Sequence, residues 1–145
     1  EAKDVLEASG LSFYLLQVEN RGRDVLPFFI IMPKVIQEGH GVILKLHTKK
    51  TSHRNDGDVW MGDILNKLVL DGNIDKHLGL IRSDKSIGML APVEHILPVS
   101  KYFGSDKRMV LDIYERLGFC ERDVKNKVFS AGTMFYVRVA AMLPI

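Results

Sequence analysis

The clearest strand pattern in the chain is the stretch Val42-Ile-Leu-Lys-Leu-His-Thr-Lys49. Successive side chains of a strand point to opposite faces of its sheet. One face is therefore expected to carry Val42, Leu44, Leu46 and Thr48, and the other to carry Ile43, Lys45, His47 and Lys49. The stretch predicts a buried strand with one apolar face and one face on which positive charge gathers.

Helices and strands are predicted to alternate on both sides of this strand. Before it, we expect a helix end at 1–9, a strand at 12–18 and a buried helix within 27–36. After it, we expect helices from Asp58, Asn73 and Ser105 and near Val139, and strands at 86–92 and 128–138. This alternation favours an α/β fold with a mainly parallel sheet flanked by helices. Ligands of such sheets bind beyond the carboxyl ends of the strands.

Length and composition are those of one ordinary globular domain. The chain has 145 residues, 46% of them apolar, and a formal net charge of +2. We expect a single domain over 1–145, incomplete at both ends because the sequence lacks an initiator Met and stops in an apolar stretch. No apolar run is long enough to span a bilayer. The single Cys120 has no disulfide partner, so we expect a cytoplasmic protein.

A basic cluster follows the predicted strand. Residues 45–54 include three lysines, one arginine and two histidines, with no acid before Asp56. A solvated face would also produce such a run. Nucleic acid is a competing partner, but no aromatic residues accompany the cluster to stack on bases. Convergence of basic groups at a strand end favours a phosphate or diphosphate site that includes His47, Lys49 and Lys50.

The segment Asn20-Arg-Gly-Arg-Asp24 combines two guanidinium groups, an amide and a carboxylate around one glycine. Gly22 permits a tight turn and a close approach of the backbone to a ligand. A surface turn with an Arg–Asp pair is the alternative. In a binding site, the phosphate-binding residues would be Asn20, Arg21, Gly22 and Arg23. Asp24 would accept hydrogen bonds from sugar hydroxyls or act as a base.

Two further short patterns are candidate sites. Asp56-Gly-Asp58 has the spacing by which two carboxylates hold a divalent cation beside a nucleotide diphosphate. Asp58 is also placed to cap a helix, and we favour that role. Gly132 and Thr133 interrupt a predicted strand, where glycine is unfavourable. A ligand or another backbone approaching closely would explain them.

Four motifs in order resemble the rhamnan synthesis protein F family, which comprises glycosyltransferases of bacterial cell-surface polysaccharides. The motifs are Asn20-Arg-Gly-Arg-Asp24, Leu46-His-Thr-Lys-Lys50 followed by Trp60, Ile87-Gly-Met-Leu-Ala-Pro92, and Ser130-Ala-Gly-Thr-Met-Phe-Tyr136. The resemblance covers essentially the whole chain. It departs at Met61, where the family pattern leads us to expect an Arg.

The resemblance implies a nucleotide-sugar-binding fold of the GT-A kind. It also implies transfer of a sugar, rhamnose in the best-known members, from a donor such as dTDP-rhamnose to a glycan such as rhamnan or O-antigen. A lipid-linked acceptor would bring the protein to the inner face of the cell membrane.

The resemblance also gives the site residues their expected roles. Asp24 is the first choice for the base, and His47 would help to offset the charge of the departing diphosphate. Trp60, Gly132 and Thr133 would line the acceptor or sugar pocket. His47-Thr-Lys49 takes the place of the usual Asp-x-Asp motif. We therefore expect no required cofactor and weak or no dependence on Mg²⁺ or Mn²⁺.

Two other functions remain open. A non-catalytic glycan-binding or scaffolding module of a polysaccharide assembly system would tolerate the loss of Lys49 and Asp24. A partner-binding domain that uses its basic strand against an acidic polymer would show an affinity that falls steeply with salt.

Overall fold

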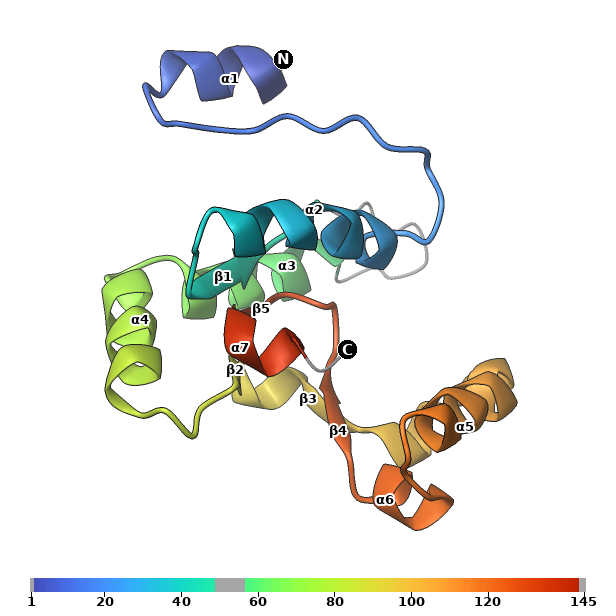
Figure 1. The fold of residues 1–145 in the computed structure, drawn as a ribbon. Coiled ribbons are helices and arrows are strands. Elements are labelled where there is room, and N and C mark those ends of the chain that lie inside the picture. Colours follow the sequence, from blue (N-terminus) through green and yellow to red (C-terminus); the bar gives the residue numbers. More distant parts are fainter. Residues whose placement is uncertain (1, 49–56, 144–145) are drawn as a thin grey trace.

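The computed structural model describes residues 2–48 and 57–143 (Figure 1). Its α-helices are α1 (Ala2–Ala8), α2 (Val25–Gln37), α3 (Gly57–Leu68), α4 (Asn73–Ser83), α5 (Lys107–Arg116), α6 (Glu121–Lys125) and α7 (Val139–Met142). Its strands are β1 (Val42–Lys45), β2 (Met89–Leu90), β3 (Ile96–Pro98), β4 (Val128–Ser130) and β5 (Phe135–Arg138). None of the described helices combines the length and the apolar character needed to cross a bilayer.

The main sheet has three strands in the order β1-β5-β2, and β3 and β4 form a separate pair. β5 is antiparallel to both neighbours, with Lys45 opposite Phe135 and Leu90 opposite Tyr136. β3 and β4 are also antiparallel. Every strand pair within the described residues is therefore antiparallel. The predicted mainly parallel sheet, and with it the GT-A-like architecture, is wrong.

The position of β5 explains this difference. Because both are antiparallel to β5, β1 and β2 run in the same direction, as strands joined through helices usually do. They do not pair with each other, since β5 comes from the far end of the chain and lies between them. Helices and strands do alternate, but a strand remote in sequence makes the sheet antiparallel.

The buried core lies between the main sheet and helices α3 and α4. It consists of Ile64, Leu68, Ile81, Met134 and Tyr136. The Tyr136 hydroxyl donates a hydrogen bond to the Leu68 carbonyl at 2.8 Å, so this buried phenol is both packed and satisfied. Val42 and Leu44 of β1 pack against the core. The opposite face of β1 is turned to α2, where the Lys45 ammonium lies 5.8 Å from the Phe28 ring centroid.

The segment before α2 differs from its prediction. Residues 12–18 were expected to form a buried strand, but they have no regular secondary structure and nearly all of them are exposed. In Figure 1 this segment extends from α1 toward α2, away from the main sheet. Aromatic and aliphatic composition favours strands only where a neighbouring strand offers hydrogen bonds, and this segment pairs with none of the described strands.

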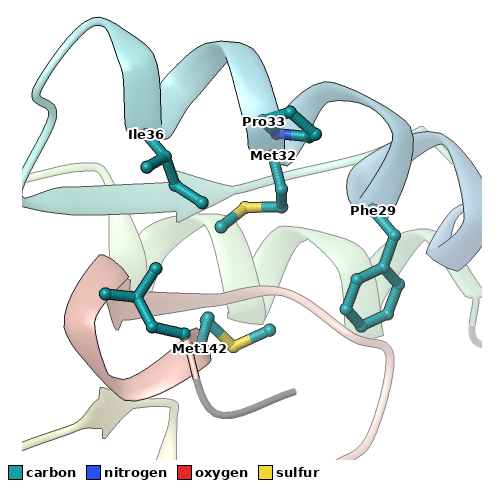
Figure 2. A pocket seen from close by; sticks show the side chains of 6 residues that line it. Phe29, Met32, Pro33, Ile36 and Met142 are labelled. Carbon is teal, nitrogen blue, oxygen red and sulfur yellow. The ribbon is translucent and has the colours of Figure 1, made fainter.

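Two cavities lie away from the predicted site residues. An apolar groove of about 210 Å³ separates α2 from α7 (Figure 2). Its lining residues are Phe29, Met32, Pro33, Ile36, Met142 and Leu143. A second cavity of about 420 Å³ lies beside α4 and β2 and is lined in part by Lys76, His77 and Glu94. Neither cavity is lined by a residue that the sequence assigns to a site.

Candidate functional site

The turn before α2 is shaped by Gly22. Gly22 has φ +68°, and a Cβ added there would lie 2.4 Å from the Leu26 Cβ. The Gly22 carbonyl accepts hydrogen bonds from the backbone amides of Val25 and Leu26, which begins the helix. Only glycine fits this tight turn. The turn places Asp24 immediately before α2, at its N-cap position.

The Asp24 carboxylate does not cap the helix but binds the side chain of Lys45. The Lys45 ammonium lies 2.5 Å from Asp24 Oδ2, and it also donates a hydrogen bond to the Thr133 carbonyl at 2.8 Å. The Lys45 side chain is only 6% exposed. A buried ammonium is costly unless it is paired and hydrogen-bonded, so the two acceptors are required for its burial.

A strained turn brings Thr133 to the same carboxylate. Gly132 has φ +87° and Thr133 has φ +53°, a conformation that a β-branched residue rarely adopts. The Thr133 hydroxyl donates a hydrogen bond to Asp24 Oδ2. On the other side of the turn, the Trp60 indole lies so close that a Cβ on Gly132 would be 2.1 Å from its Cη2 atom. Close packing against this ring, in addition to the turn, therefore requires glycine here.

His47 completes the cluster. Its Nε2–H donates to the Gly132 carbonyl at 2.6 Å, and Nε2 lies 3.8 Å from Asp24 Oδ2. The ring is 14% exposed. Its other nitrogen, Nδ1, lies 3.4 Å from the Thr48 carbonyl, at the outer limit of hydrogen bonding. The Gly132 carbonyl therefore fixes the ring and its tautomer, and Nδ1 is left weakly engaged.

The electrostatics of the cluster keep Asp24 ionised. Burial alone would raise the pKa of Asp24, but the hydrogen bonds from Lys45 and Thr133 outweigh it. Together with the positive charges of Lys45 and His47, they lower this pKa from 3.8 to about 2. A carboxylate with so low a pKa is a poor proton acceptor at neutral pH. The site therefore suits Asp24 better as a fixed negative charge than as a base.

The other predicted site residues lie in two places. Asn20, Arg21 and Arg23 are exposed in the turn beside Asp24, and neither arginine makes a side-chain ion pair or hydrogen bond within the described residues. Arg23, like Gly22, has a positive φ. Asp58 lies exposed in the first turn of α3. Lys49, Lys50 and Asp56 lie outside the described residues.

The fold thus brings together five residues that the sequence assigns to the site: Asp24, His47, Trp60, Gly132 and Thr133. The strand pattern also placed Lys45 and His47 on one face, and both point to the 132–133 turn. Lys45 belongs to the basic cluster of the sequence, but its ammonium is occupied by the Asp24 carboxylate and the Thr133 carbonyl. A lysine between two leucines in a buried strand signals a need for a counterion, and Asp24 is that counterion.

No group of three or more metal-ligating side chains was found within the described ranges. Asp58 lies in the first turn of α3, and Asp56, its partner in the Asp-Gly-Asp pattern, lies outside the described residues, so the cation site at this pair stays a prediction. Basic side chains were expected to offset the charge of the diphosphate. Among the described residues, Arg21, Arg23 and His47 are the ones that remain available for this role.

Comparisons with known proteins identify the relatives of the chain. The family model described as rhamnan synthesis protein F matches residues 1–145, which confirms the resemblance of the four motifs. The uncharacterized protein WxcX from two strains of Xanthomonas campestris pv. campestris is 33% identical over 145 residues. This match covers 100% of the chain but 21% of each relative, so the chain spans about a fifth of their length. No solved structure matches the chain.

Substitution of Gly132 by Ala tests the packing of the turn. The new Cβ would overlap the Trp60 ring and adopt a positive φ, whereas Gly118→Ala adds a Cβ at φ +82° with nothing within 4 Å. We expect Gly132→Ala to lower the free energy of unfolding by at least about 1 kcal/mol more than Gly118→Ala. Urea unfolding followed by the fluorescence of Trp60, the single tryptophan, measures both. Equal losses would contradict the packing described.

Acid titration tests the Asp24 ion pair. Because its pKa falls from 3.8 to about 2 on folding, the pair stabilises the fold fully above pH 4 and loses this contribution as the pH falls through 2. The difference corresponds to about 2 kcal/mol. Urea unfolding between pH 2 and pH 7 should show this loss in the unmodified chain and a flatter profile in Asp24→Asn. Identical profiles would exclude the pair as the cause.

Proposed function

Because the chain belongs to the rhamnan synthesis protein F family, a family of polysaccharide synthesis, we propose that it binds a nucleotide-diphosphate sugar and takes part in glycosyl transfer. The donor proposed is dTDP-rhamnose, and the acceptor is a growing cell-surface polysaccharide. The observation that supports the proposal most directly is the fixed Asp24–Lys45–Thr133–His47 cluster beside two exposed arginines.

In this proposal Lys45 and Asp24 hold the site in place and do not react. The Lys45 ammonium is buried and occupied by Asp24 Oδ2 and the Thr133 carbonyl. The lowered pKa of Asp24 keeps its carboxylate negative at neutral pH. This charge, 3.8 Å from His47 Nε2, stabilises the imidazolium that forms when His47 takes a proton. Asp24, first choice as base from the sequence, is thus better suited to orient and stabilise His47.

His47 is the proposed proton acceptor for the acceptor hydroxyl. Donation of Nε2–H to the Gly132 carbonyl leaves the lone pair of a neutral ring on Nδ1. The Thr48 carbonyl, 3.4 Å from Nδ1, cannot donate to this lone pair because both atoms are acceptors, so Nδ1 is available to a substrate hydroxyl. An imidazole operating near neutral pH is well matched to this role.

The exposed arginines are the proposed diphosphate ligands. Breaking a glycosyl–diphosphate bond passes through an oxocarbenium-like transition state, and the departing diphosphate requires positive charge. Arg21 and Arg23 have no ion pair with any described residue and lie next to Asp24 in the chain. Guanidinium groups bind phosphate oxygens through paired hydrogen bonds. Lys49 and Lys50 are proposed to add to this charge.

Calorimetric titration with dTDP and dTDP-rhamnose, with and without Mg²⁺, tests the proposal. We expect binding without Mg²⁺, and we expect Arg21→Ala and Arg23→Ala to weaken it by roughly tenfold or more, because each removes a charge-assisted hydrogen bond. Arg108→Ala is the matched control, since Arg108 is an exposed arginine of α5. His47→Gln should bind dTDP with nearly unchanged affinity but lower sugar transfer by roughly a hundredfold.

Failure of dTDP to bind would contradict the proposal. Binding of an oligosaccharide acceptor without any nucleotide would instead support the alternative of a non-catalytic glycan-binding module. Equal effects of Arg21→Ala, Arg23→Ala and Arg108→Ala would show that the affinity reflects overall charge, as in a domain that binds an acidic polymer. An unchanged transfer rate in His47→Gln would remove His47 from the role of base.

A further inference from the structure

A second histidine–aspartate pair lies on the other side of Trp60. The buried His95 donates a hydrogen bond from Nε2 to Asp63 Oδ2 at 2.8 Å. Lys67 contacts the same carboxylate at 2.9 Å and Glu94 at 2.8 Å. The hydrogen bonds from His95 and Lys67 lower the pKa of Asp63, so its charge is available to hold the ring. Sequence reasoning found no role for His95 or Asp63.

His95 contacts two residues that border the 132–133 turn, Trp60 and Ala131. Its ring meets the Trp60 ring edge to face, with centroids 5.2 Å apart and an interplanar angle of 78°. Its backbone carbonyl accepts a hydrogen bond from the Ala131 amide at 2.7 Å, immediately before Gly132. Trp60 in turn packs against Gly132. The turn is thus held from one side by His95 and Trp60 and from the other by Asp24 and Lys45.

The Gly132 carbonyl is the group that orients His47, at 2.6 Å from Nε2. A movement of the turn directly alters this hydrogen bond, which is the shortest contact of the His47 ring with the described residues. The contacts of the ring with Thr133 Oγ1, the Thr48 carbonyl and Asp24 Oδ2 are longer, at 3.3, 3.4 and 3.8 Å. Any group that fixes Trp60 and Ala131 therefore also fixes the direction of His47.

We propose that Asp63 and His95 are positioning residues of the candidate site. The Asp63 carboxylate fixes the His95 ring, His95 fixes Trp60 and the turn, and the turn orients His47. The significance of these contacts for ligand binding rests on the function proposed above. The arrangement itself concerns only the residues of this chain, so it has a test that does not depend on a ligand.

The test compares Asp63→Ala with the matched control Glu94→Gln. Both disturb the ion pairs of Lys67, but only Asp63→Ala removes the partner of His95. Long-range ¹H–¹⁵N spectra of the histidine rings report the tautomer of His47 and the exchange of its Nε2 proton. We expect Asp63→Ala to shift the His47 signals and accelerate this exchange, Asp63→Asn to restore them in part, and Glu94→Gln to leave them unchanged.

The rate of sugar transfer gives the second readout. We expect Asp63→Ala to lower this rate by roughly 2- to 30-fold at a temperature where the variant is fully folded, and Glu94→Gln to have no effect. Unchanged His47 signals in Asp63→Ala, or equal changes in Glu94→Gln, would overturn the inference. If the unmodified chain does not bind dTDP, the proposed function fails, and the His47 signals alone decide whether Asp63 and His95 position the turn.

Discussion

The buried ammonium of Lys45 is the constraint on which the candidate site depends. A lysine on a buried strand must find acceptors, because an unpaired charge out of water costs several kcal/mol. Lys45 finds them in Asp24, 21 residues earlier in the chain, and in the Thr133 carbonyl, 88 residues later. One side chain therefore joins the start of α2, the end of β1 and the turn before β5.

These contacts of Lys45 and Asp24 explain why an unfavourable backbone conformation persists at Thr133. Its positive φ directs the carbonyl to Lys45 and the hydroxyl to Asp24, so the strain is offset by two hydrogen bonds. Gly132, at the preceding position, offers its carbonyl to His47 and its open α-carbon to Trp60. The 132–133 turn therefore contacts the Asp24–Lys45 ion pair on one side and the Trp60 ring on the other. It also orients His47, the titratable side chain proposed to react.

Most of the helices could be predicted from the sequence, but the lack of a strand at 12–18 and the pairing of the strands could not. Apolar spacing and glycine stops placed α2, α3, α4 and α5 within a few residues of where they lie. The sheet was predicted as mainly parallel because helices separate β1 from β2. Insertion of β5 between them depends on long-range packing around Tyr136, which no local pattern encodes.

The candidate site, like the fold, could be predicted from the sequence only in part. Chemical character singled out Asp24, His47, Gly132 and Thr133, the family resemblance added Trp60, and the fold brings these residues together. The roles within the cluster required the structure, because only the geometry shows that Lys45 is engaged by Asp24. Asp63 and His95 gave no signal in the sequence, since their importance arises from contact with Trp60 rather than from spacing.

The most direct test of the central claim is a double-mutant cycle on the free energy of unfolding, with Lys45→Met, Asp24→Asn and the double variant. If Lys45 and Asp24 depend on each other, each single variant leaves a buried group without its partner, and the double variant is less destabilised than the sum of the two. We predict a coupling of at least about 1 kcal/mol at pH 7. Additive effects of the two substitutions would show that the pair does not hold the site together, and would contradict the account.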